Sequence, residues 1–313
     1  MTSALAFDLA LAALVLAIAT LTIAAREAMS AVISFIAYGL LLSLAWVRLR
    51  APDVALTEAA IGAGVTGLLL LGAAATIGQR QAGAAPPLAL MLAAGLACAL
   101  VASGLAATTL VLLPEPAPTL APPAMASLAT TGLGNPVTAV LFVYRALDTL
   151  LEKVVLVLAL LGVWSLAPDR VWGGVARLGP DAPPRAMLVF LAQLLPPVGM
   201  LIAIYMFWTG ADHPGGAFQG GAILAAMWLI VLTARLADMP ATSHPGLRLL
   251  VLAGPMLFAA IGFAGWALAD AFLAYPEGYA KPLIILAEAG LTLSIAATLA
   301  CLVAGPSART PPP

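Results

Sequence analysis

Carboxylates in unusually apolar surroundings are the residues of this sequence that could do chemistry. Glu58 lies in the stretch APDVALTEAAIGAGVTG, five residues after Asp53, and Glu288 lies in the run KPLIILAEAGLTLSIAATL. A charge at the centre of a membrane helix costs about 2.5–3.5 kcal/mol even on lenient scales, so buried acids commonly serve ion pathways. We interpret all three as ion-path candidates. The open alternative is a neutral, hydrogen-bonded acid that only holds helices together.

Small residues share a helix face with Glu58. Gly62 and Thr66 follow it at i+4 and i+8. Small side chains allow a second helix to approach closely, so this carboxylate is expected to point at protein rather than at lipid.

Four charged residues cluster in NPVTAVLFVYRALDTLLEKVVLVLALLGVW, residues 135–164. Arg145, Asp148 and Glu152 have the spacing i, i+3 and i+7, which places them on one helix face, and Lys153 is adjacent. Paired charges lower the cost of burial, and a mixed stripe could pass protons or bind a cation. A cluster that only anchors the helix at the headgroups is the open alternative.

The stretch GADHPGGAFQGGAI, residues 210–223, interrupts two apolar runs. Asp212 or His213 is predicted to cap a helix that begins at Pro214, because proline suits the first helical turn. Both side chains are further candidates for the ion path. Gly215 and Gly216 expose the backbone, which is tolerated at membrane depth only against protein or a wet cavity.

The same stretch carries two pairs of small residues at i, i+4. These are Gly216 with Gly220 and Ala217 with Gly221. Such spacing permits close contact between helices. The interruption is therefore expected to be a tightly packed re-entry into the membrane.

The composition defines the elements that must position these residues. Of 313 residues, 63% are hydrophobic and only 9% are charged, with a mean hydropathy of +1.09. A soluble domain carries about a quarter charged residues, so the chain is expected to be an all-α, polytopic membrane protein. The net charge of -1, without a basic run, gives no support for nucleic-acid binding.

No cofactor, metal site or catalytic centre is predicted. The two cysteines, Cys98 and Cys301, lie in separate apolar runs and are expected to be small core residues. The sequence shows no cysteine–histidine cluster, nucleotide fingerprint or nucleophile pattern.

Nine membrane spans are predicted, and they fall into blocks. The spans are roughly 4–25, 28–47, 54–77, 88–113, 147–166, 187–209, 216–236, 248–270 and 282–304. The predicted divisions are a four-span module (1–113), a Pro/Ala-rich linker (114–134), an amphipathic helix with one span (135–166), a second linker (167–185) and a four-span module (186–313).

The distribution of Lys and Arg predicts the orientation. Apart from Lys153, one side collects Arg26, Arg80, Arg170, Arg177, Arg185, Arg235, Arg248 and Arg309, and the other collects Arg48, Arg50, Arg145 and Lys281. Positive residues favour the cytoplasm, which predicts an outside N-terminus and a cytoplasmic C-terminus in a cell inner membrane.

The three motifs together resemble the membrane subunits of Mrp-type multisubunit Na+/H+ antiporters and of related membrane-bound hydrogenases. APDVALTEAAIGAG is similar to the small domain that ends the antiporter A subunit. GADHPGGAFQGGAI is similar to the glycine-rich signature of the B subunit. NPVTAVLFVYRALDTLLE resembles the charged motif between them, and the matching positions are Asn135, Arg145, Asp148, Thr149 and Glu152.

The resemblance implies an accessory subunit that packs against larger antiporter-like subunits and contributes acids to a path for Na+ or H+. Two alternatives stay open. The chain could be the coupling subunit of a hydrogenase-like respiratory complex, or a scaffold whose polar groups only fix helix packing.

Overall fold

The computed structural model describes residues 3–77, 87–112, 119–178 and 183–310. Arg80 and parts of both predicted linkers lie outside these ranges. The helices are α1 (Ser3–Ala24), α2 (Ala28–Arg48), α3 (Pro52–Thr57), η1 (Glu58–Val65), α4 (Thr66–Ile77), α5 (Leu88–Ala107), η2 (Thr108–Leu112), α6 (Ala121–Ala126), α7 (Leu128–Thr131), α8 (Pro136–Ala139), η3 (Val140–Tyr144), α9 (Ala146–Trp164), η4 (Asp169–Val171), α10 (Ala186–Thr209), α11 (Ala217–Thr233), α12 (Pro245–Leu268) and α13 (Ala280–Ala304). The strands β1 (Val175–Ala176) and β2 (Ser307–Arg309) pair antiparallel.

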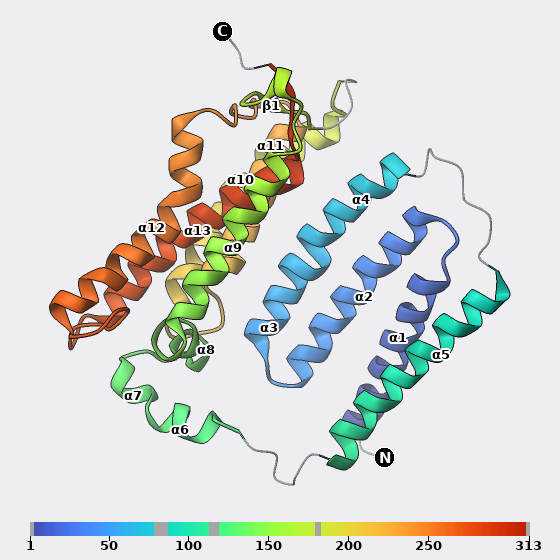
Figure 1. Cartoon of the computed structure of the whole chain (residues 1–313), viewed down its shortest axis with the longest axis horizontal. Helices are drawn as coiled ribbons and strands as arrows, with labels where there is room; N and C mark the ends of the chain where they lie inside the picture. The colour runs from blue at the N-terminus through green and yellow to red at the C-terminus, as the bar shows by residue number, and fades with distance from the viewer. Residues whose placement is uncertain (1–2, 78–86, 113–118, 179–182, 311–313) are drawn as a thin grey trace.

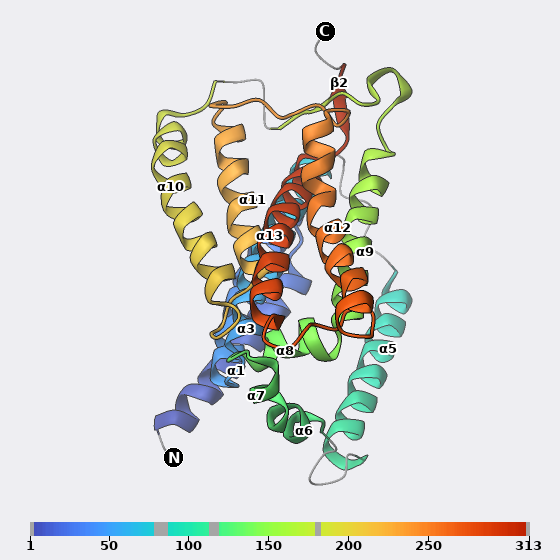
Figure 2. The same cartoon turned by 90° about the vertical axis from the view of Figure 1, so that its left-hand side faces the viewer.

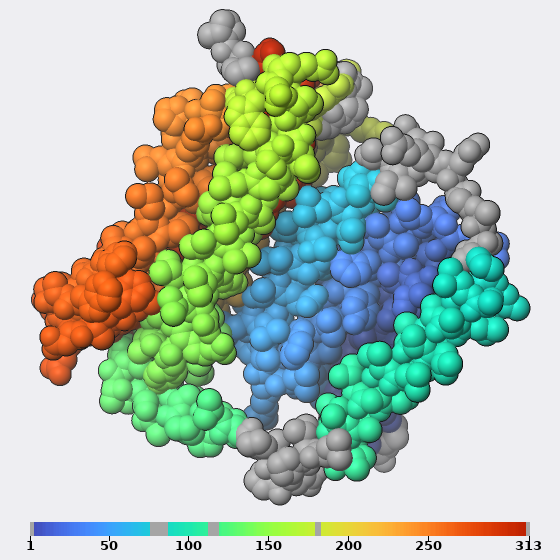
Figure 3. Space-filling view, viewed as in Figure 1, coloured from blue at the N-terminus to red at the C-terminus, as the bar shows by residue number. Residues whose placement is uncertain are grey.

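The long helices form two neighbouring groups (Figures 1 and 3). The first contains α1, α2 and the continuous rod α3–η1–α4, and the second contains α9 to α13. They meet where α11 packs against α3 and η1. Helix α5 differs from the rest, because every one of its residues is exposed. Cys98 lies on α5, so its prediction as a core residue was wrong, whereas Cys301 is buried as expected.

Helix α13 is the centre of the second group (Figure 2). It packs against α11, α12, α10 and α9, and two thirds of its most apolar stretch is buried. A helix that is apolar all round is stable in the interior of a bundle, where neighbouring helices surround it. Glu288 lies on this central helix and is only 2% exposed.

The prediction of a polytopic all-α membrane protein is confirmed, but the count of nine spans is not. Seven of the described helices are long and apolar enough to cross a membrane. The two others among the predicted spans are α9, which contains Asp148, Glu152 and Lys153, and α11, which has only 17 residues. Both contact α13 within the second group; α11 has eight buried residues, whereas α9 has four and exposes many of its apolar side chains.

The two ends of the helix bundle carry different loops. One end holds the connections from α9 to α10 and from α11 to α12, together with β1 and β2 (Figure 2). The other end holds α6 to α8, the α10–α11 loop and the α12–α13 loop. The first described residue of α1 and the last residue of α13 lie at opposite ends.

The rod after Pro52 changes its winding at Glu58. From this residue to Val65 the helix is a π-helix, with hydrogen bonds from residue i to i+5. The prediction that Glu58, Gly62 and Thr66 share one face was based on α-helical periodicity. In the structure the Glu58 carboxylate folds over Gly62, where an added Cβ would collide with its Oε1.

Close backbone contact between α12 and α13 gives a test of the packing. A Cβ on Gly254 would lie 2.8 Å from the Gly290 carbonyl oxygen and 2.8 Å from the Leu291 Cα. We therefore expect Gly254→Ala to lower the free energy of unfolding by about 1–3 kcal/mol through overpacking. The measurement is thermal unfolding of the purified chain in detergent.

Gly95→Ala is the matched control, because nothing lies within 4 Å of an added Cβ there. Its unfolding temperature should equal or slightly exceed that of the wild type. Equal behaviour of the two variants would contradict the close α12–α13 contact.

Candidate functional site

The candidate site is a cavity of about 250 Å³ between α3, α9, α11 and α13. Its polar lining includes Asp53, Lys153, Gln219 and Glu288, which come from four different helices. All four side chains are at most 8% exposed. The structure thus brings together one residue from each of the three motifs, and adds Glu288.

Asp53 is held by groups from distant parts of the chain. Its Oδ1 accepts hydrogen bonds from the Gly215 backbone N–H at 3.0 Å and from Asn135 Nδ2 at 3.3 Å. Gln219 Nε2 donates to Thr57 Oγ1 at 2.9 Å and to the Asp53 carbonyl oxygen at 3.4 Å. The carboxylate therefore ties the first helix group to the second.

Glu288 faces the beginning of α11. The Ala217 backbone N–H donates to its carboxylate, and its Oε2 has no hydrogen-bond partner among the described residues. A helix N-terminus carries a partial positive charge, which stabilises an anion there. One oxygen of this buried carboxylate is thus free to bind a water, a proton or a cation.

Lys153 enters the cavity from α9. Its side chain is 4% exposed, and its Nζ lies 3.2 Å from the centre of the Phe218 ring. It also lies 3.5 Å from Glu152 Oε2. A ring face attracts an ammonium group, more strongly when water is excluded. Lys153 therefore occupies an apolar position with one aromatic and one carboxylate neighbour.

The Gly215–Gly216 turn lies between the two buried acids. Gly215 donates to Asp53, and a Cβ on Gly216 would lie 3.2 Å from Glu288 Oε1. Their φ angles are +153° and +135°, which side chains disfavour. A Cβ on Gly215 would also lie 2.5 Å from the Met206 carbonyl oxygen. Glycine is required here because backbone, not side chain, fills the space between the carboxylates.

The predicted charged stripe divides into an exposed part and a buried part. Arg145 and Asp148 form an ion pair of 2.5 Å with side chains that are 71% and 55% exposed, and Glu152 is 51% exposed. The expected burial of this stripe is therefore wrong for this chain by itself. The helix breaks at Arg145, whose φ of −132° ends η3, and α9 starts afresh with only Lys153 of the four directed inward.

A second cavity of about 310 Å³ adjoins the first at this exposed stripe. Arg145 and Asp148 line it, and Glu152 lines both cavities. The two cavities are therefore neighbours that share Leu141, Thr149 and Glu152 in their linings.

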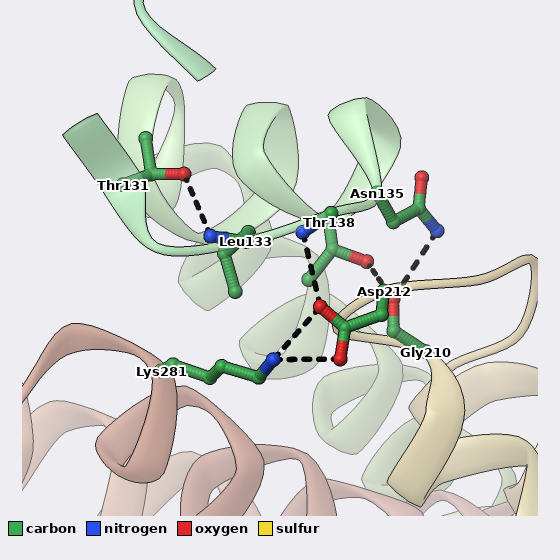
Figure 4. Close-up of polar contacts among 8 residues, drawn as sticks. Thr131, Leu133, Asn135, Thr138, Gly210, Asp212 and Lys281 are labelled. Atoms are coloured by element: carbon green, nitrogen blue, oxygen red, sulfur yellow. Dashed lines mark hydrogen bonds and ion pairs between the residues drawn. The ribbon is translucent and has the colours of Figure 1, made fainter. Parts of the chain in front are cut away.

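A hydrogen-bonded loop fixes the entrance to α11 (Figure 4). Asn135 Nδ2 donates to the carbonyl oxygens of Gly210 at 3.2 Å and His213 at 3.0 Å, and Thr138 Oγ1 donates to that of Gly210 at 2.6 Å. Asp212 accepts from the Gly134 N–H at 3.2 Å. The loop is thus closed by the segment before α8.

The predicted capping role of Asp212 and His213 is wrong. Helix α11 begins at Ala217, not at Pro214, and its N-cap is Gly216, without a side-chain cap. Asp212 instead pairs with Lys281 Nζ at 2.6 and 2.8 Å (Figure 4). The Lys281 ammonium holds the pKa of the Asp212 carboxyl below its usual value.

The remaining predicted residues lie outside the cavity. Glu58 is half-buried beside Gly62 in η1. Gly220 and Gly221 are packing positions, where an added Cβ would lie 2.9 Å from the Ala203 carbonyl oxygen and 2.7 Å from Ile295, respectively. They bring α11 against α10 and α13.

The hydroxyls of α13 beyond Glu288 are satisfied by backbone. Thr292 Oγ1 donates to the Glu288 carbonyl oxygen at 2.7 Å, and Thr298 Oγ1 donates to that of Ser294 at 2.8 Å. Ser294 donates to the Val251 carbonyl oxygen. This part of α13 is a packed interface with no free polar group.

Two residues of the site escaped the sequence reasoning. Gln219 is an amide within an apolar helix, a signal that could have been used. Phe218 carried no signal, because nothing in the sequence places its ring against Lys153. Among residues 3–77, 87–112, 119–178 and 183–310 there is no group of three or more His, Cys, Asp or Glu side chains that could hold a metal ion.

Two families match separate parts of the chain. Residues 13–79 match the MbhD family of MBH subunits, and residues 187–308 match the family described as a domain related to the MnhB subunit of Na+/H+ antiporter. These matches confirm the family resemblance inferred from the motifs. No curated protein matches the chain.

Two solved structures share the fold. A chain of the Mrp complex from Dietzia sp. DQ12-45-1b is 24% identical with a TM-score of 0.74, and the match covers 97% of this chain and 35% of that one. A chain of the membrane-bound sulfane sulfur reductase, an archaeal respiratory membrane complex, is 23% identical with a TM-score of 0.55. That match covers 68% of this chain and 98% of the other.

The Asp212–Lys281 pair predicts a pH-dependent stability. Because the folded pKa of Asp212 is depressed, its contribution is present above the usual carboxyl pKa of about 3.9 and is lost as the pH falls through the lower folded value. Asp212→Asn should lower the free energy of unfolding near pH 7 by about 0.5–1 kcal/mol, since the pair is partly exposed. Thermal unfolding across pH measures this.

The difference between variant and wild type should disappear well below pH 4. Asp270→Asn is the control, because Asp270 is exposed and asparagine tolerates its φ of +61°. A pH-independent loss in Asp212→Asn would show that the carboxylate charge is not responsible.

Proposed function

We propose that this chain, which is composed of Mrp-type antiporter subunit domains related to those of the membrane-bound hydrogenase, is a membrane subunit of a multisubunit Na+/H+ antiporter. In this proposal the cavity formed by Asp53, Lys153 and Glu288 is part of the ion path. The observation that carries it is the meeting of two buried acids and one buried lysine in a single cavity, with one Glu288 oxygen unpartnered among the described residues.

The cavity has room for the water that ion transfer requires. Its volume is about 250 Å³, and a water molecule occupies about 30 Å³ in the liquid. Buried charges persist only if they are paired or solvated. Water between Lys153 and Glu288 would meet this need and would also relay protons.

The order of the residues suggests a direction from surface to interior. Protons enter along the exposed Arg145–Asp148 pair, pass Glu152, and reach Lys153 and then Glu288. Lys153 lies seven residues into α9, which is about 10 Å of helix rise. The path therefore reaches only part of the way through a hydrocarbon core of about 30 Å. Partner subunits are proposed to supply the rest.

The proposed cargo is Na+ and H+. Glu288 offers a carboxylate oxygen to either ion, and oxygen is the donor that hard cations prefer. The proposed location is the cell inner membrane, with the N-terminus outside, so that the cavity opens at the outer face.

The second candidate function is a coupling subunit in a respiratory oxidoreductase. The observation that favours it is the match to the sulfane sulfur reductase chain, which is covered over 98% of its length. With only two cysteines in the sequence, iron–sulfur chemistry would belong to partners. Purification in mild detergent distinguishes the candidates, since a cluster-bearing peripheral subunit would accompany the chain only in the second case.

Replacing Glu288 tests the proposed ion path. We expect Glu288→Gln to leave the assembled complex intact and to lower Na+-driven proton flux in membrane vesicles at least about ten-fold, because the amide cannot exchange a proton. Lys153→Met should have a similar effect. Flux is measured per assembled complex, so that changes in yield are removed.

Glu277→Gln is the matched control, because Glu277 is exposed in the α12–α13 loop. Its flux should equal that of the wild type. If Glu288→Gln instead lowers the yield or the unfolding temperature while flux per complex is unchanged, the polar groups are a scaffold and the transport role is wrong.

The other acids of the proposal have graded expectations. Asp148→Asn at the exposed mouth should lower flux less than Glu288→Gln, since bulk water can replace a surface carboxylate. Glu58→Gln should lower flux only if a partner subunit extends the path to η1. Normal flux in both variants would confine the path to the cavity.

A further inference from the structure

A groove separate from the two cavities described above lies between α9 and α12, away from the buried acids. Its volume is about 290 Å³, and its walls are apolar side chains, including Val157, Leu161, Val251 and Leu252. At one end it is bordered by Trp164, Trp172 and Arg248. None of the ion-path candidates lines this groove.

The positions of these residues along α9 and α12 indicate the depth of the groove in the membrane. Arg248 is in the first turn of α12, and Trp164 is the last residue of α9, so both lie at the ends of their helices. Val157 and Leu252 lie further along the helices, toward the middle of the membrane. Tryptophan and arginine are typical of the membrane–water boundary. The groove therefore begins at the headgroup level and continues into the hydrocarbon.

The Arg248 guanidinium uses only one of its nitrogens in a hydrogen bond to the described residues. Its Nε donates to the Thr242 carbonyl oxygen at 2.9 Å, which orients the planar group. The two Nη atoms have no partner among the described residues, and the side chain is exposed at the mouth of the groove. An oriented guanidinium with two free nitrogens matches the oxygens of a phosphate.

The loops at this end are positively charged. Among the described residues in 165–178, 183–185, 234–248 and 305–310, the basic side chains are Arg170, Arg177, Arg185, Arg235, Arg248 and Arg309, and the acidic ones are Asp169 and Asp238. Clustered arginines at the membrane surface attract anionic lipids, at about 1 kcal/mol for each residue. The charge of this end is therefore complementary to an anionic headgroup.

We propose that this groove is a binding site for an anionic glycerophospholipid. One acyl chain lies between α9 and α12 against Val157, Leu161 and Leu252. The phosphate binds the free side of Arg248, and Trp172, which is 55% exposed, covers the glycerol level. The lipid would hold α9 against α12 at the end opposite the ion cavity.

Lipid binding to the full chain tests the proposal. The chain is purified in mild detergent, stripped of lipid, and titrated with phosphatidylglycerol or with phosphatidylcholine of identical acyl chains, and bound lipid is counted by native mass spectrometry. We expect phosphatidylglycerol to bind more tightly. Arg248→Gln should raise its Kd about five-fold, as expected for the loss of one arginine–headgroup contact, and leave phosphatidylcholine unchanged.

Three further variants separate the contributions. Arg248→Lys keeps the charge but loses the planar guanidinium, so its Kd for phosphatidylglycerol should lie between those of the wild type and Arg248→Gln. Arg26→Gln removes an exposed arginine between α1 and α2, outside the groove, and should have no effect. Val157→Trp should fill the groove and abolish retention of both lipids without touching the headgroup contact.

Several results would overturn the proposal. If Arg26→Gln and Arg248→Gln weaken phosphatidylglycerol binding equally, the binding depends on general surface charge and not on the groove. Equal binding of the two lipids by the wild type would remove headgroup recognition. A photo-crosslinker at Leu252 that captures a protein subunit of the assembled complex, rather than lipid, would assign the groove to a protein interface.

Discussion

The approach of backbone amides to two buried carboxylates is the interaction on which the site depends. Gly215 donates to Asp53, and the first amide of α11 donates to Glu288, so one turn of chain contacts an acid from each helix group. Peptide dipoles can stabilise such charges in addition to the buried cation of the cavity, Lys153. Asn135 contacts both the Asp53 carboxylate and two carbonyl oxygens of the α10–α11 loop, so the segment before α8 also holds this loop against Asp53.

The sequence predicted the long helices and identified the polar residues that lie in apolar surroundings. Apolar runs of about twenty residues predicted the long helices, since this length crosses a bilayer as a helix, which satisfies its backbone hydrogen bonds within the segment. The three motifs could also be recognised without coordinates. What they could not provide was the partner of each side chain. Glu152 and Lys153 are neighbours in the sequence, yet one is half exposed and the other is 4% exposed.

The errors share a physical origin. Arg145, Asp148 and Glu152 do share one helix face and line one cavity, but that face is exposed, whereas the adjacent Lys153 points inward. The Glu58 prediction is not one of these errors, because its carboxylate does lie against Gly62 although η1 has π-type winding. The start of α11 was placed at Pro214, because capping preferences are local, whereas here the loop is held by Lys281 and Asn135 from distant segments. Each correction came from tertiary contacts that local patterns do not encode.

The close packing of α13 beyond Glu288 has a consequence for a copy of the chain that is in the membrane before it meets a partner. Thr292, Ser294 and Thr298 give their hydroxyl hydrogens to backbone carbonyls, so along α13 these three hydroxyls do not extend the polar lining of the cavity inward. An unassembled copy in the bilayer would therefore offer ions no row of free hydroxyls along this helix.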